Sequence, residues 1–158
     1  MGMDVYGKKA TSVKGRYFRN SVWGWHPLAN YCQVVAPSIA KKCKYWHTND
    51  GAGLSGEDSL LLAGMLEVEV GSGRCAAYEK EYEAARAALP KETCEFCSGT
   101  GARTDTVGKQ NGLDKPGGCN GCAGTGQKEN WDASYPFSVD NVKEFITFLN
   151  HSGGFEIW

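Results

Sequence analysis

Features that would place a protein at a membrane are missing from this 158-residue sequence. No apolar run approaches the ~18 residues that a membrane-spanning helix needs. The first residues contain no apolar core of the length found in a signal peptide. Tyr6 stands where an N-myristoylation pattern requires Ser or Thr. We therefore expect a cytoplasmic protein that has no membrane partner.

Cysteine is plentiful, with seven residues, and four of them lie in a duplicated phrase. Residues 94–101 read Cys-Glu-Phe-Cys-Ser-Gly-Thr-Gly, and residues 119–126 read Cys-Asn-Gly-Cys-Ala-Gly-Thr-Gly. Two C-x-x-C knuckles supply the four thiolates of a closed tetrahedral site. The sequence therefore predicts one structural Zn²⁺ per chain, bound by Cys94, Cys97, Cys119 and Cys122.

The glycines after each cysteine pair favour this prediction, because glycine adopts positive φ and allows two backbones to approach closely. Two disulfides are the alternative for four cysteines. A reducing compartment, which we expect here, keeps thiols available for a metal. Iron or an iron–sulfur cluster also suits four thiolates and remains an alternative to zinc.

The duplicated phrase resembles the C-x-x-C-x-G-x-G repeat in the cysteine-rich domain of DnaJ-type co-chaperones. The resemblance covers Cys94 to Gly126. In that family four repeats bind two zinc ions, whereas two repeats here suffice for one. The chain has no His-Pro-Asp tripeptide and no Gly/Phe-rich linker. The resemblance therefore implies zinc ligation by the four cysteines and does not extend to chaperone activity.

Two helices are predicted before the knuckles. Ser55 followed by acidic residues resembles a helix N-cap, and a helix over about 56–70 follows. After Gly71, a second apolar stripe recurs at three- and four-residue steps and ends before Pro90. Its members are Cys75, Tyr78, Tyr82, Ala85 and Leu89. These segments form an antiparallel helix pair or one helix kinked at Gly71.

Further elements are predicted at both ends of the chain. Pro27 and Pro37 each suit the first turn of a helix. Ser138 suits the N-cap of another helix, which Gly153 would end, and 155–158 suit a terminal strand. The expected fold is mainly α, a small α+β protein. It has one domain over 1–158, in which residues 91–131 form an inserted, zinc-binding, β-hairpin-like arm.

The segment between the knuckles, 102–118, is polar and rich in glycine, so an exposed hairpin or loop is expected. It is either a solvated connector or a recognition tip. As a tip it would present Arg103, Lys109, Gln110, Asn111 and Lys115.

Charge is distributed unevenly although the net charge is −1. Residues 1–50 hold eight Lys or Arg and two acidic residues, and the rest of the chain is acidic. Aromatic residues alternate with these cations, which favours three interpretations: core packing, a protein-binding surface, or binding of single-stranded nucleic acid. The candidate binding residues are Arg16, Arg19, Trp23, Trp25, His47, Asn49 and Asp50.

No catalytic residue is predicted. The polar stretch from His47 to Gly53 is either a turn or an anion site at a helix start, but it lacks the Lys and Ser/Thr of a P-loop. Cys32 or Cys43 could be drawn as a nucleophile with His26 or His47 as its base, yet no local signature supports the pairing. We expect these two cysteines and Cys75 to be core residues.

Residues 1–7, 17–20 and 49–53 also resemble a family of small bacterial and bacteriophage proteins, a resemblance that implies no particular activity. Together these features predict a non-catalytic, zinc-stabilised protein-interaction module. It would act as an adaptor or, in a phage, as an inhibitor of a host protein. The alternative is a small protein that binds single-stranded nucleic acid through its basic, aromatic N-terminal part.

Overall fold

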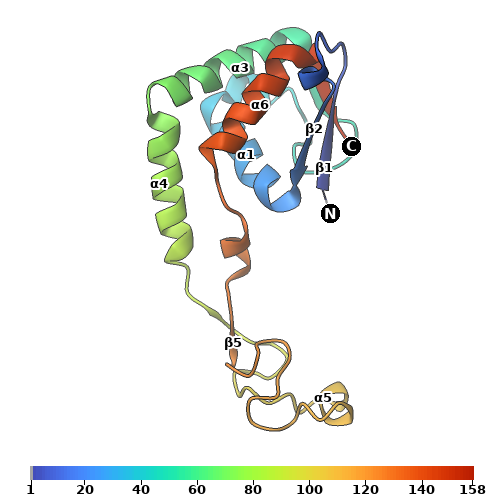
Figure 1. Cartoon of the computed structure of the whole chain (residues 1–158), viewed down its shortest axis with the longest axis vertical. Coiled ribbons are helices and arrows are strands. Elements are labelled where there is room, and N and C mark those ends of the chain that lie inside the picture. Colours follow the sequence, from blue (N-terminus) through green and yellow to red (C-terminus); the bar gives the residue numbers. More distant parts are fainter. Residues whose placement is uncertain (1) are drawn as a thin grey trace. The chain divides into compact units, whose positions relative to one another are not determined.

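The computed structural model describes residues 2–158, which form a small α+β fold of two compact units (Figure 1). Unit 1 consists of the chain up to Ala85 together with Tyr135–Trp158. Unit 2 is Arg86–Ser134. In the part of the chain that is described, no helix is both long and apolar enough to span a membrane.

Unit 1 contains a four-stranded antiparallel sheet in the order β2-β1-β6-β3. The strands are β1 Gly2–Gly7, β2 Tyr17–Ser21, β3 Gly53–Ser55 and β6 Gly154–Ile157. The C-terminal strand β6 lies between β1 and β3, with Val5 opposite Ile157 and Leu54 opposite Phe155. The predicted terminal strand is thus confirmed. Because it pairs with β1, the two ends of the chain lie side by side in the sheet.

Helices α1 Val22–Val35, α3 Gly56–Gly71 and α6 Val139–Ser152 pack on this sheet and enclose an aromatic core. The short helix α2 Pro37–Ala40 packs against α1 and α3, and α4 Arg74–Ala87 follows α3 in the chain. In β1, the alternate residues Met3 and Val5 are buried. The largest fully buried side chains include Trp25, Phe145 and Phe155. Unit 1 therefore has a core of its own, built from both ends of the chain.

The predicted helix caps of α3 and α6 are confirmed. The Ser55 hydroxyl accepts a hydrogen bond from the Asp58 N–H at 3.1 Å, and the Ser138 hydroxyl accepts one from Asn141 N–H at 3.4 Å. Gly153 ends α6 with a φ of 61°, in the left-handed region that favours glycine. Local capping signals located both helices correctly.

The two helices expected before the knuckles are confirmed as α3 and α4, but the antiparallel arrangement is wrong, because α3 packs against α6 and α1. A second prediction, the helix start at Pro27, is also wrong. The helix expected to start at Pro27 begins at Val22, where the Ser21 side chain accepts the Gly24 N–H. Pro27 lies inside α1 and removes one intrahelical hydrogen bond there.

Unit 2 has little regular structure. A two-stranded sheet pairs β4 Glu92–Thr93 with β5 Gln127–Lys128. One short helix, α5 Thr106–Gln110, and a 3₁₀ turn at Trp131–Ser134 complete it. The loop expected at 102–118 therefore includes one helical turn, which Asp105 caps by accepting the Gly108 N–H at 2.8 Å.

Candidate metal centre

Four cysteine side chains of unit 2 converge on one point. The sulfur atoms of Cys94, Cys97, Cys119 and Cys122 all lie within 4.8 Å of one another. The Sγ atoms of Cys94 and Cys119 are 3.9 Å apart, and those of Cys97 and Cys122 are 3.7 Å apart. A tetrahedron with Zn–S bonds of about 2.3 Å has edges of about 3.8 Å. The spacing therefore fits a tetrahedral thiolate site.

The same distances exclude disulfides, in which the sulfur atoms would be about 2.05 Å apart. All seven cysteines are free and buried. The cysteine cluster is consistent with zinc, as the sequence predicts, and the geometry does not distinguish zinc from iron in a thiolate site.

The two knuckles have nearly the same backbone conformation. The residue after the second cysteine has positive φ in both, 50° at Ser98 and 49° at Ala123. The N–H of Gly101 donates to Cys97 Sγ at 3.3 Å, and that of Gly126 donates to Cys122 Sγ at 3.2 Å. These N–H groups favour ionised sulfur, because hydrogen bonds stabilise the charged form.

Close backbone approach explains the final glycine of each knuckle. At Gly101 a Cβ atom would lie 2.4 Å from the carbonyl oxygen of Gly124, and at Gly126 it would lie 2.3 Å from that of Gly99. Both residues also have φ above 70°. A side chain at either position would push the knuckles apart and so would enlarge the sulfur cage.

Two thiols of the cluster, Cys119 and Cys122, have pKa values shifted in opposite directions. Burial raises the pKa of Cys119 to about 11. At Cys122 burial acts in the same direction, but the Gly126 N–H and the neighbouring thiols outweigh it and lower the pKa to about 7. The surroundings of Cys122 therefore favour its thiolate, the form that binds a metal.

Two cations lie beside the cluster and share one aromatic ring. The guanidinium of Arg103 is 4.8 Å from the centre of the Phe96 ring, and Lys128 Nζ is 4.3 Å from it. Phe96 belongs to the first knuckle and packs over Gly121 of the second. The ring is 43% exposed. Unit 2 therefore presents an aromatic side chain flanked by two ion pairs, Arg103 with Asp105 and Lys128 with Glu95.

The candidate binding residues of unit 1 do not gather at one place. Trp25 is fully buried, and its indole N–H donates to the carbonyl of Trp46 at 2.6 Å. Arg16 and Arg19 lie at β2 with exposed side chains, and Arg19 lies 3.7 Å from Asp4. Asp50 is exposed in the loop before β3.

His47 and Asn49 do come together, along with His26, which was considered as a catalytic base in the sequence. These three line a pocket of about 340 Å³. The rings of His26 and His47 are 4.5 Å apart, and His26 stacks on Tyr135 with an interplanar angle of 9°. Trp23 also contacts Tyr135, at 4.9 Å between ring centres. Burial lowers the pKa of both imidazoles, and the proximity of His26 lowers that of His47 further.

The glycine-rich start of α3 has a different structure from a phosphate loop. Residues 51–56 match G-x-G-x-x-G by sequence. The backbone there is extended and pairs with β6, so that the Gly51 N–H donates to Ile157 O and the Ile157 N–H donates to Ala52 O. Residues 48–51 bend and Gly53–Ser55 form strand β3, so the segment reaches the Ser55 cap through a strand and not through the turn expected from the sequence.

The three remaining cysteines lie in the core of unit 1, as expected. Cys32, Cys43 and Cys75 are at most 3% exposed. Burial raises the pKa of each, to about 11 for Cys43. Their thiols are therefore protonated at neutral pH and are poor nucleophiles.

No protein-family model matches the chain, and neither a curated protein nor a solved structure matches it. The likeness of the knuckles to DnaJ-type repeats consequently rests on the residues of 94–101 and 119–126 alone.

Proposed function

We propose that the protein is a zinc-stabilised protein-interaction module without catalytic activity. The observation that carries the proposal is the closed cage of four buried sulfur atoms at tetrahedral spacing. Catalytic zinc sites keep one coordination position for water or substrate, whereas structural sites fill all four with protein ligands. A cage of four cysteines belongs to the structural kind.

The metal would replace a hydrophobic core in unit 2. Among the described residues of this unit, the buried apolar cluster consists of the same four cysteines. Zinc bound there cross-links the two knuckles, and its binding free energy becomes folding free energy. A module whose shape depends on a metal and that offers no reaction centre is typical of binding proteins.

Phe96 is the residue of unit 2 that best suits a partner anchor. Aromatic side chains that protrude from a rigid support often dominate interface energies. The ring is held over Gly121 between Arg103 and Lys128, so its position is fixed by the knuckles. The proposed partner is a protein, bound as by an adaptor or, in a phage setting, by an inhibitor of a host protein.

Affinity capture with matched variants tests this function. The zinc-loaded wild-type chain and the variant Val107→Ala should retain the same partner, because Val107 is a comparably exposed apolar residue of the same unit. Phe96→Ala should lose most of the partner, and Cys97→Ser/Cys122→Ser should lose both zinc and partner. Capture that is the same for all four chains would overturn the proposal.

Binding of nucleic acid is the competing function and gives a different result. A chain that uses its basic N-terminal part should bind single-stranded oligonucleotides with an affinity that falls steeply as salt rises. Four aromatic residues of that part, Phe18, Trp25, Tyr31 and Trp46, are buried in the core and not displayed for stacking. We therefore expect no salt-sensitive oligonucleotide binding, and its detection would favour the alternative.

A further inference from the structure

Helix α3 has two apolar faces, of which only one is covered. The inner face contains Leu62, Ala63 and Leu66, which are fully buried. The opposite side, here called the outer face of α3, consists of Leu60, Leu61, Gly64, Met65 and Val68, all exposed. Acidic residues such as Glu67 lie between these faces, so α3 has a second apolar stripe beyond the single one that a surface helix needs.

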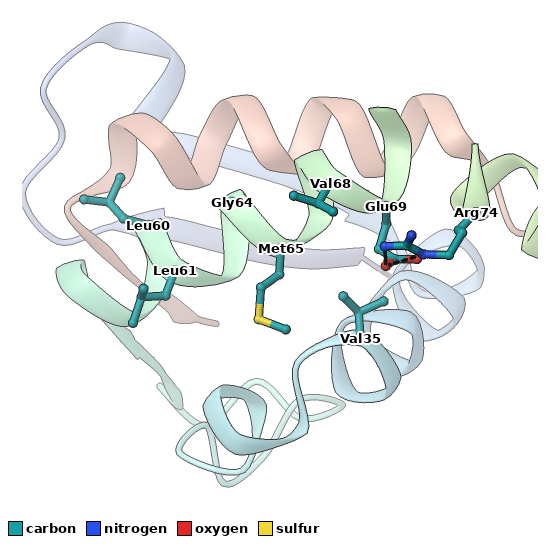
Figure 2. A pocket seen from close by; sticks show the side chains of 8 residues that line it. All are labelled: Val35, Leu60, Leu61, Gly64, Met65, Val68, Glu69 and Arg74. Atoms are coloured by element: carbon teal, nitrogen blue, oxygen red, sulfur yellow. Dashed lines mark hydrogen bonds and ion pairs between the residues drawn. The ribbon is translucent and has the colours of Figure 1, made fainter. Parts of the chain in front are cut away.

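The outer face borders a hollow that is open to solvent. Figure 2 shows Met65 pointing between α3 and the end of α1, where Val35 lies, and the Glu69–Arg74 ion pair at one end. The hollow has a volume of about 470 Å³. Its lining is apolar apart from this pair, so it suits an apolar side chain rather than a polar ligand.

The apolar surface has the size of an interaction patch. Four large side chains of the outer face are 39–60% exposed, and Val34 on α1 is 68% exposed. We take their exposed area as on the order of 400 Å², within the range that marks interaction sites on monomers. Two such patches supply on the order of 800 Å² of apolar area, close to the non-polar share of a standard interface.

The outer face is also self-complementary. Gly64 lies at the middle of α3, Leu60 and Leu61 precede it, and Met65 and Val68 follow it. Glu57 lies at the start of the helix, and Arg74 follows its end. In an antiparallel pair of identical helices centred near Gly64, Leu61 meets Val68 of the other copy. Glu57 of one copy then lies near the C-terminal end of α3 of the other copy, close to the Arg74 of that copy.

From this arrangement we propose that the outer face of α3 docks on the same face of a second copy of the chain, with the two α3 helices antiparallel. A twofold axis requires a patch that complements itself. In the antiparallel order the apolar residues of the two outer faces meet one another, and Glu57 approaches the Arg74 of the other copy, which also pairs with Glu69 of its own chain. No heavy atom lies within 4 Å of a Cβ built on Gly64, so the partner helix can approach closely there. The antiparallel order also opposes the two helix dipoles favourably.

Sedimentation of the zinc-loaded full chain over a range of concentrations tests the pairing. The wild-type chain should be a dimer that dissociates on dilution. Leu61→Glu should raise the dissociation constant more than tenfold, because two buried carboxylates would replace an apolar contact. Val13→Glu is the matched control, since Val13 is 75% exposed in the same unit and lies on the 3₁₀ turn Val13–Gly15, not on α3. It should leave the dissociation constant unchanged.

Charge exchange tests the orientation. Glu57→Arg and Arg74→Glu should each weaken the dimer severalfold, and the double variant should recover most of the wild-type affinity. Circular dichroism establishes that each variant is folded, which matters because Arg74 also pairs with Glu69. A wild-type chain that stays monomeric, or a dimer indifferent to Leu61→Glu, overturns the proposal. A double variant as weak as the single ones overturns the antiparallel arrangement.

Discussion

The backbone N–H of Cys94 donates to the carbonyl of Gly126 at 2.9 Å, which ties the first residue of one knuckle to the last residue of the other. The reciprocal bond, from the Cys119 N–H to the carbonyl of Gly101, has the same length. The two knuckles thus hold each other by a symmetric pair of hydrogen bonds as well as by their sulfur atoms. The shape of the cage depends on both.

Replacement of Gly126 by alanine should therefore damage the metal centre without touching a ligand. The new Cβ would lie 2.3 Å from the carbonyl oxygen of Gly99, at a φ of 79°. We expect a loss of about 2–3 kcal/mol in the stability of unit 2, from left-handed strain and overpacking together. Competition with a zinc chelator measures the loss as weaker metal binding.

Gly112→Ala separates strain from overpacking. Gly112 has a φ of 69°, and no heavy atom lies within 4 Å of its Cβ position. Strain alone should then cost about 1 kcal/mol, and zinc affinity should change little. Equal losses for the two variants would show that the contact between the knuckles does not govern the cage.

Thiol accessibility should divide the seven cysteines into two groups. In the zinc-loaded chain a water-soluble thiol reagent should react with none of them quickly, because all are buried. A chelator should expose Cys94, Cys97, Cys119 and Cys122, since unit 2 has no other apolar cluster among its described residues. Cys32, Cys43 and Cys75 should stay protected, because the core of unit 1 does not depend on metal.

Mass spectrometry after labelling counts the modified cysteines. Metal analysis of the same sample should give one zinc per chain, and an iron centre would reveal itself by visible absorption. Rapid labelling of Cys32 in the chelated chain would contradict the independence of the two units.

The metal centre could be predicted from the sequence because its signal is local. Each knuckle places two cysteine ligands within four residues of the sequence. Because the phrase is duplicated, the sequence also shows that a second pair of ligands exists. The hydrogen bonds between Cys94 and Gly126 and between Cys119 and Gly101 join residues 32 and 18 positions apart, and no local pattern reveals such partners. The cation–π contacts of Phe96 were missed for the same reason.

The fold was predicted where capping signals are strong and missed where pairing is non-local. Ser55, Ser138 and Gly153 marked the helix ends correctly. Strands β1 and β2 were not predicted. The alternation of Met3 and Val5 is a weak strand signal, and β1 pairs with β6 at the other end of the chain, a partner that no local pattern reveals. The helix start predicted at Pro27 was wrong because proline is commonest in the first turn of a helix, whereas α1 begins earlier, at Val22.

Asp58 should contribute to stability in a pH-dependent manner. Lys42 Nζ donates to one carboxylate oxygen at 2.5 Å, and the Ser55 hydroxyl donates to the other at 2.9 Å. These bonds, that of Lys42 foremost, lower the pKa of Asp58 below its ordinary value of 3.8. A lowered pKa stabilises the folded state above the unfolded pKa, and this stability is lost as the pH falls through the folded value.

Asp58→Asn should accordingly lower the free energy of unfolding by about 1 kcal/mol at pH 7. The difference from wild type should shrink as the pH falls below 4, which urea denaturation at several pH values measures. Asp140→Asn is the control, because Asp140 also lies in the first turn of a helix but its side chain is 85% exposed and pairs only with Lys143. It should cost less than half as much. A penalty for Asp58→Asn that persists unchanged at pH 2 would contradict the ionic origin.

The imidazoles of His26 and His47 should titrate as a coupled pair. Burial lowers the pKa of His47 below its ordinary value of 6.5, and His26 lowers it further because two positive rings 4.5 Å apart repel each other. His26→Gln should therefore raise the pKa of His47 towards 6.5 without reaching it, whereas His151→Gln should leave it unchanged.

Because a lowered histidine pKa means that the folded state binds fewer protons than the unfolded one, the wild-type chain should lose stability as the pH falls through 6.5. The His26→Gln variant should lose less. Proton NMR of the imidazole resonances measures both pKa values, and a His47 pKa that ignores His26→Gln would show that the two rings do not interact in solution.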